Sequence, residues 1–142
     1  MDYLAVFTSE KGIDLINRFD LKMVLLFGSQ VAGVTHAHSD IDLAYISNRR
    51  LEISEESRML IELVPLLRSK HIDLVDLRHA PPLLKKQIAR KHIVLYQTQD
   101  APVSDFVAQS FREYDEARPL RVALHEYLTK RIGGFAQELK HA

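Results

Sequence analysis

The sequence predicts an α/β (α+β) fold, in which a mixed, roughly four-stranded sheet is flanked by helices and followed by a helical tail. Four apolar segments of strand length recur along the first two thirds of the chain, and segments with helical spacing separate them. Beyond about residue 100 the pattern becomes one long, mainly helical stretch. With 142 residues, 46% hydrophobic and 27% charged, the composition is typical of a globular protein with a real core.

The first half of the chain contains two of the predicted strands. Ser9 is suited to cap a first helix, in which apolar residues recur at helical spacing. Residues 22–27 form a short buried strand that ends at Gly28. A brief helix opens at Ser29 and is closed by a glycine. Residues 41–46 form the second strand.

The next part repeats this alternation. A helix starts at Ser54 and is kinked or ended by Pro65. Residues 71–77 form the third strand, and the Pro81–Pro82 pair then fits a helix start. Residues 92–96 form the last strand, so the predicted sheet is complete before residue 100.

The change of pattern near residue 100 predicts two parts. Residues 1–100 form the domain, and residues 101–142 form a helical tail that packs on the domain or on a partner. Pro119 is expected to break or kink this tail.

Charge and composition exclude several classes of protein. The formal net charge is zero, which argues against a protein that grips nucleic acid through a bulk positive field. Without cysteine there is no disulfide framework, thiol nucleophile or thiolate metal site. The N-terminus lacks a basic segment followed by an apolar run, and no apolar stretch reaches membrane-spanning length. We therefore expect a cytoplasmic protein without direct membrane or nucleic-acid binding.

The second strand begins with a carboxylate pair, Asp40 and Asp42. Side chains two positions apart in a strand share a face, so these carboxylates repel each other unless a cation lies between them. Mg²⁺ suits such a position, because it binds one or two carboxylates together with substrate phosphates. Asp73 on the third strand supplies a third acid if the two strands are neighbours, which would suit a two-metal site. An Asp-x-Asp pair alone is common in strands, so the prediction depends on its combination with Asp73. Asp76 lies on the opposite face of the third strand from Asp73 and is expected to cap a loop or helix.

Gly28 and Ser29 favour phosphate binding on the other side of this site. A glycine after a buried strand lets the backbone approach a ligand closely, and the helix start that follows presents N–H groups to an anion. Ser29 adds a hydroxyl donor. Triphosphate on one side and metal on the other is the layout of nucleotide transfer.

These residues carry a family resemblance. Gly28-Ser29, ten intervening residues and then Asp40-Ile41-Asp42 resemble the signature of the DNA-polymerase-β-like nucleotidyltransferase superfamily. The "SDIDLAYIS" segment and the block that starts "HIDLVDLRHAPP" are similar to its minimal nucleotidyltransferase (MNT) domains. The resemblance implies a nucleotidyltransferase fold, ATP as substrate, Gly28 and Ser29 as nucleotide-binding residues, and Asp40, Asp42 and Asp73 as catalytic Mg²⁺ ligands. It further implies an antitoxin that transfers AMP to a tyrosine of a HEPN-domain RNase toxin and forms a hetero-oligomer with it.

The sequence departs from this pattern near the Gly-Ser pair. Many relatives carry a basic residue just after the Gly-Ser pair or two positions further, where this chain has Gln30 and Ala32. Arg49, Arg50 or a lysine of the helix over residues 85–91 would have to supply that charge instead. The loop also contains His36 and His38, which the signature does not require and which we interpret as polar loop residues rather than zinc ligands.

Two other functions fit the same residues. A binding-only antitoxin would cover its toxin sterically and keep the acidic site as a remnant. A small-molecule nucleotidyltransferase would need a further substrate-binding region, of which the short tail supplies little.

Overall fold

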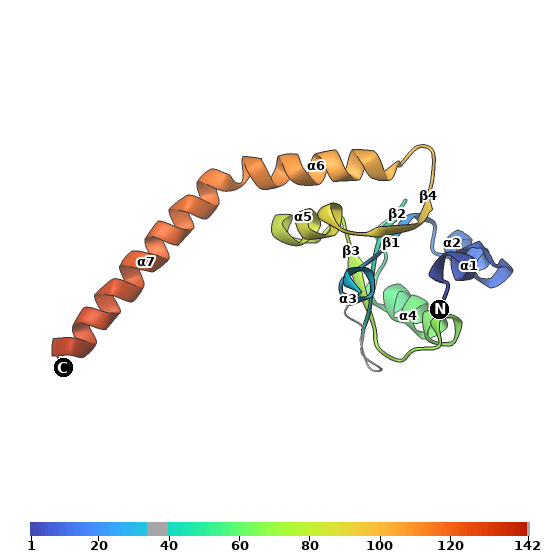
Figure 1. Cartoon of the computed structure of the whole chain (residues 1–142), viewed down its shortest axis with the longest axis horizontal. Helices are drawn as coiled ribbons and strands as arrows, with labels where there is room; N and C mark the ends of the chain where they lie inside the picture. Colours follow the sequence, from blue (N-terminus) through green and yellow to red (C-terminus); the bar gives the residue numbers. More distant parts are fainter. Residues whose placement is uncertain (34–39, 142) are drawn as a thin grey trace.

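The computed structural model describes residues 1–33 and 40–141, which form one sheet and a series of helices (Figure 1). The strands are β1 Leu21–Phe27, β2 Ile41–Ser47, β3 Ile72–Asp76 and β4 Ile93–Gln97. The helices are α1 Tyr3–Thr8, α2 Glu10–Arg18, α3 Ser29–Ala32, α4 Ile53–Leu67, α5 Pro82–Arg90, α6 Val103–Glu116 and α7 Arg118–His141. No helix in these ranges is both long and apolar enough to cross a bilayer.

The four strands form a mixed sheet in the order β3-β2-β1-β4. β1 lies at the centre and pairs antiparallel with both β2 and β4, whereas β2 and β3 are parallel. The parallel pair is connected through α4, because a parallel connection needs a crossover. The predicted α+β fold with a mixed four-stranded sheet is therefore confirmed.

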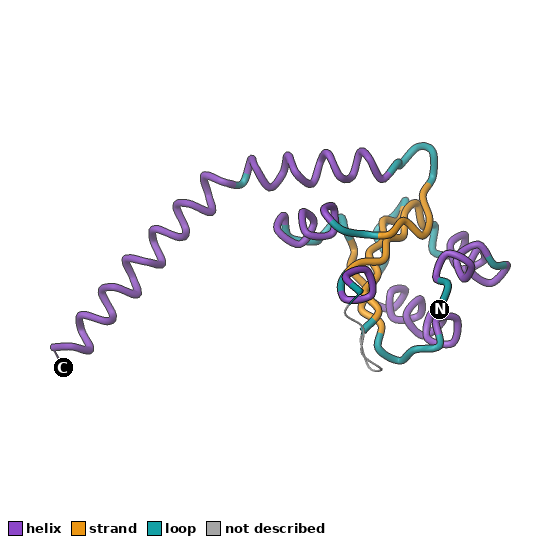
Figure 2. The backbone as a smooth tube through the Cα atoms, viewed as in Figure 1, coloured by secondary structure: helices purple, strands orange, loops and turns teal. Residues whose placement is uncertain are grey.

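Helices cover both faces of the sheet, and each face has its own apolar core (Figures 1 and 2). On one face α1, α2 and α4 pack over alternate strand residues such as Leu26, Leu43 and Tyr45. On the other face α5 and α6 pack over Met23, Leu25 and Ala44. The alternation of side chains along each strand assigns its residues to these two cores.

The two C-terminal helices behave differently. α6 lies along α5 and buries Val103 and Phe106 in the second core. α7 then extends away from the sheet and the other helices (Figures 1 and 2). Apolar side chains of α7 such as Leu120 and Ile132 are accordingly exposed. The division at residue 100 remains a prediction, since α6 packs closely on the part that precedes it.

The strands begin and end within one residue of their predicted limits at most positions, and the differences fall on helix ends. The sequence reading missed α1, whose C-terminus is Ser9, the residue that also caps α2. α4 begins at Ile53 rather than Ser54, because Glu52 caps it together with the side chain of Glu55. Pro65 lies inside α4, which ends two residues later.

The break in the tail comes just before Pro119 rather than at it. α6 ends at Glu116, and Pro119 is the second residue of α7. Proline is tolerated in the first turn of a helix, where an N–H has no helical partner. The pair Gly133–Gly134 lies within α7 without ending it.

The close contact between Gly12 of α2 and the backbone of α1 predicts that a side chain at this position lowers stability. A Cβ on Gly12 would lie 2.2 Å from the carbonyl oxygen of Val6, so the two helices touch through their backbones. We expect Gly12→Ala to lower the free energy of unfolding by about 1–3 kcal/mol, because α1 must move away. Chemical denaturation measures this change.

Gly134→Ala is the matched control, because a Cβ there meets no atom within 4 Å. It should leave stability unchanged or raise it slightly, as alanine favours helix. Equal stability of the two variants would contradict the close packing of α1 on α2.

Candidate active site

Asp42 and Asp73 lie side by side on the two parallel strands. They are direct register partners of β2 and β3, so their side chains project from the same face. The same alternation places them on the face that carries Ala44 and Val75, which α5 and α6 cover further along the strands. The convergence of these two acids follows from the parallel pairing of β2 with β3.

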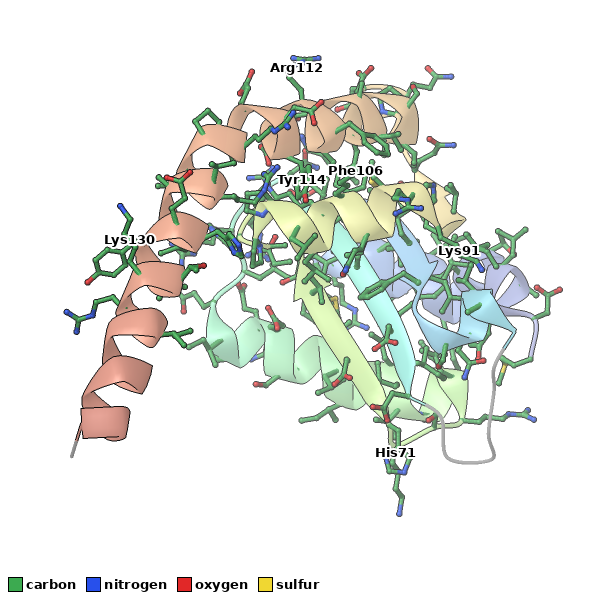
Figure 3. All side chains as sticks on the ribbon, turned by 60° about the vertical axis from the view of Figure 1, so that its left-hand side comes forward. His71, Lys91, Phe106, Arg112, Tyr114 and Lys130 are labelled. Carbon is green, nitrogen blue, oxygen red and sulfur yellow. The ribbon has the colours of Figure 1, made fainter. Side chains whose placement is uncertain are left out.

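Asp40 lies just before β2 and is exposed. Its carboxylate Oδ1 is 3.9 Å from Nδ1 of His71, and the backbone N–H of Ile41 donates to the carbonyl of His71. Figure 3 shows His71 beyond the strand ends, at the opposite end of the sheet from Phe106. The start of β2 is thus tied to the residue that precedes β3.

The electrostatics of Asp42 reflect this crowding. Burial raises the pKa of the Asp42 carboxyl above its usual value, and the negative charges of Asp73 and Asp40 raise it further, together with a hydrogen bond to Asp73. No lysine or arginine of the described residues forms an ion pair with Asp42. Ionised Asp42 therefore has no lysine or arginine counter-charge within residues 1–33 and 40–141.

Gly28 closes the other side of Asp42. Its φ of 77° is a conformation that side-chain-bearing residues rarely adopt, and an added Cβ would lie 2.1 Å from Asp42 Oδ2. Only glycine permits the turn to touch the carboxylate. Ser29 then begins α3, and the carbonyl of Gly28 accepts hydrogen bonds from Val31 and Ala32. The Gly-Ser turn and the carboxylates therefore form one contiguous site.

The donor set of this site fits Mg²⁺. Its ligands would be carboxylate oxygens, which this hard cation prefers, and a positive charge would offset the repulsion around Asp42. Within residues 1–33 and 40–141 no three His, Cys, Asp or Glu side chains already surround a common position. Asp42 and Asp73 are the two carboxylates that lie side by side, while the Asp40 carboxylate faces His71.

Three of the basic residues suggested as substitutes near the Gly-Ser pair lie elsewhere, whereas Lys91 precedes β4, whose Ile93 pairs with Leu26 near the Gly28 end of β1. Arg49 follows the far end of β2 and pairs with Glu55 at 2.8 Å, and Arg50 is its neighbour. Lys85 on α5 pairs with Glu113 at 3.0 Å. The structure therefore offers none of these three beside Gly28.

Asp76 and the loop histidines complete the account of the predicted residues. Asp76 accepts a hydrogen bond from the backbone of Arg78, so its role as a turn cap agrees with the prediction. His36 and His38 lie outside the described residues. Sequence reasoning missed the contact of Tyr3 with Gln30, because no local pattern links residues so far apart in the chain.

A mixed sheet that sets paired aspartates beside a Gly-Ser turn defines a class of protein that handles nucleotides. A model of the family described as polymerase beta, nucleotidyltransferase matches residues 10–101. This match covers more than half of the chain and all four strands. The chain therefore belongs to the polymerase beta nucleotidyltransferase family.

Curated relatives extend this result. The chain is 35% identical over 79 residues to a protein adenylyltransferase MntA of Shewanella oneidensis, and this match covers 56% of each protein. It is 36% identical over 87 residues to a protein of the same name from Aphanizomenon flos-aquae, covering 54% of this chain and 57% of that one. The matched segments thus span about half the length of these relatives.

Solved structures resemble the chain over most of its length. A chain of the crystal structure of a toxin–antitoxin with AMP-PNP superimposes with a TM-score of 0.71 and 29% identity, covering 84% of this chain and 96% of that one. A chain of the tri-AMPylated Shewanella oneidensis HEPN toxin in complex with its MNT antitoxin gives a TM-score of 0.64 and 26% identity. That match covers 82% of this chain and 92% of the other.

The raised pKa of Asp42 predicts how stability depends on pH. Between the ordinary carboxyl pKa near 3.8 and the raised folded value, the folded protein holds more protons than the unfolded chain. Stability of the metal-free protein therefore falls as pH rises through this window. We expect Asp42→Asn to melt higher than wild type at pH 7 in EDTA, by about 2–4 °C for each kcal/mol gained.

The difference between Asp42→Asn and wild type should shrink as the pH falls below 3.8, where the Asp42 carboxyl becomes protonated in the unfolded chain as well as in the folded protein. Asp105→Asn is a suitable control, because that carboxylate is exposed on α6. A lower melting temperature of Asp42→Asn at pH 7 would contradict the repulsion at this site.

Gly28→Ala tests the contact between the turn and Asp42. Gly33→Ala is the matched control, because Gly33 has nearly the same φ, 76°, but a Cβ there meets nothing within 4 Å. Both variants carry the backbone strain, about 1–2 kcal/mol. We expect Gly28→Ala to lose clearly more stability and to bind nucleotide more weakly, as measured by denaturation and equilibrium titration with ATP. Identical losses in the two variants would contradict the contact.

Proposed function

We propose that this chain is an antitoxin nucleotidyltransferase that transfers AMP from ATP to a tyrosine of a cognate HEPN RNase toxin. The observation that carries the proposal is the contact of Gly28 with Asp42, which pairs with Asp73 in register. This contact supports the proposal, because a turn that could bind phosphate against two carboxylates is the arrangement that nucleotide transfer requires. The names of the MntA relatives and of the toxin–antitoxin complexes support the same reaction and partner.

The reaction is a displacement at the α-phosphorus of ATP. The phenol oxygen of the acceptor tyrosine forms a bond to this phosphorus, and the bond to the bridging oxygen of the β-phosphate breaks. Pyrophosphate leaves with that electron pair. The phenol proton passes to a carboxylate, for which we propose Asp73, because it is exposed and lies beside Asp42.

Asp40, Asp42 and Asp73 would hold Mg²⁺. When bound, the cation neutralises the phosphates and the charge that develops on the leaving group. The protein's own contribution is positioning: the rigid pairing of β2 with β3 fixes the separation of two carboxylates, and Gly28 and Ser29 hold the triphosphate against them.

The setting of this activity is the cytoplasm, where ATP and the toxin are both present. We infer a hetero-oligomer with the toxin, in keeping with the toxin–antitoxin complexes that the chain resembles. Direct binding to nucleic acid or membrane is not part of this proposal, in keeping with a net charge of zero.

Incubation with ATP, Mg²⁺ and a cognate HEPN toxin tests the proposal. Mass spectrometry should show the toxin gaining the mass of one AMP or a small multiple, on tyrosine. The modified toxin should remain inactive as an RNase after this protein is removed. Asp42→Asn should lower the transfer rate at least about 100-fold, the scale on which loss of a charge-stabilising group acts.

The control experiment measures whether the Asp42→Asn variant still forms a complex with the toxin. Asp42→Asn should still bind the toxin, since the substitution keeps size and removes repulsion. An unchanged toxin mass, with inhibition that needs no ATP and ends on separation, would establish a binding-only antitoxin. AMP transfer to small molecules in the absence of the toxin would establish the small-molecule enzyme instead.

A further inference from the structure

The N-terminal helix α1 reaches the nucleotide-binding turn through one side chain. The hydroxyl of Tyr3 donates to the side-chain carbonyl oxygen of Gln30 at 3.3 Å, across 27 positions of the sequence. Gln30 is the second residue of α3 and lies two positions after Gly28. The contact therefore joins the first helix of the chain to the Gly-Ser turn.

The position of Tyr3 is well fixed. Its ring packs on the same apolar cluster that Val31 of α3 contacts, and Phe7, one turn along α1, is fully buried in it. The side chain of Asp2 caps α1, and Gly12 brings α2 into backbone contact with it. The helix that carries Tyr3 is thus capped and packed, so Tyr3 can act as a positioned hydrogen-bond donor.

The direction of the hydrogen bond determines what Gln30 can offer. Burial raises the pKa of the Tyr3 phenol, so the group stays protonated and donates. A glutamine side chain has one carbonyl acceptor and an NH₂ group with two donors. Tyr3 engages only the carbonyl, and phosphate oxygens accept hydrogen bonds of the kind that an NH₂ group donates.

We propose that Tyr3 is a positioning residue for the nucleotide: it holds the carbonyl of Gln30 so that the Gln30 NH₂ group is presented to the phosphates beside Gly28 and Ser29. This inference rests on the proposed function, since it assigns a role toward the ATP of that same site. It gives the turn a neutral donor, whereas Arg49 pairs with Glu55 and Lys85 pairs with Glu113.

The affinity for ATP in the presence of Mg²⁺ tests this role, measured by equilibrium titration without any toxin. Tyr3→Phe keeps the ring and removes only the hydroxyl. We expect it to weaken ATP binding on the order of 3–10-fold, the effect of one hydrogen bond. Tyr96→Phe is the matched control, because Tyr96 packs on the same cluster without a hydrogen bond to α3 among the described residues. It should bind ATP as wild type does.

A double-mutant cycle shows whether Tyr3 acts through Gln30. In a Gln30→Ala background, Tyr3→Phe should have no further effect on ATP binding. Gln30→Glu keeps an acceptor for Tyr3 but replaces the NH₂ group with a negative oxygen, so it should bind ATP more weakly than Gln30→Ala. Its melting temperature should stay close to that of wild type.

Three results would overturn the inference. The first is a Tyr3→Phe variant that binds ATP as tightly as wild type, and the second is an effect of Tyr3→Phe that persists in the Gln30→Ala background. Gln30→Glu that binds ATP like wild type would show that the NH₂ group does not meet phosphate. A wild-type protein that fails to bind ATP would overturn the proposed function as well, whereas the other results would leave that function intact.

Discussion

The site depends on one interaction: the Asp42 carboxylate is held between a glycine backbone and a second carboxylate. Gly28 lies so close that no side chain fits between them, and Asp73 occupies the neighbouring register position. The resulting repulsion and burial raise the pKa of Asp42. A stable fold tolerates this cost because the two strands are fixed by packing elsewhere, and a cation can relieve it.

The two faces of the sheet differ in role: one carries the larger apolar core, and the other carries the acidic residues. The face under α1, α2 and α4 carries the larger apolar cluster and holds the strands in register. The opposite face carries the acids at the start of β2 and β3, while α5 and α6 cover only its remaining length. This arrangement leaves the acidic end accessible to a nucleotide and an acceptor. α7 extends beyond both layers (Figure 1).

Sequence patterns predicted the strands, because each is a short apolar run bounded by turn residues. They also predicted that Asp42 and Asp73 would meet if their strands were neighbours, which the parallel pairing of β2 with β3 confirms. They did not predict α1, which is six residues long and has little periodicity to detect. They also missed the contact of Tyr3 with Gln30, since tertiary packing alone joins such distant positions. The suggested role of Arg49 was wrong, because the far end of β2 lies about 20 Å from its start.

The most direct test of this account is the melting temperature of the protein during a Mg²⁺ titration at saturating ATP and neutral pH. The account predicts a rise in melting temperature for wild type, because a bound cation offsets the charge of Asp42 and its neighbours. Asp42→Asn, with the repulsion already removed, should show little or no rise. An equal rise in both proteins would contradict the claim that Asp42 is the centre of a cation-dependent site.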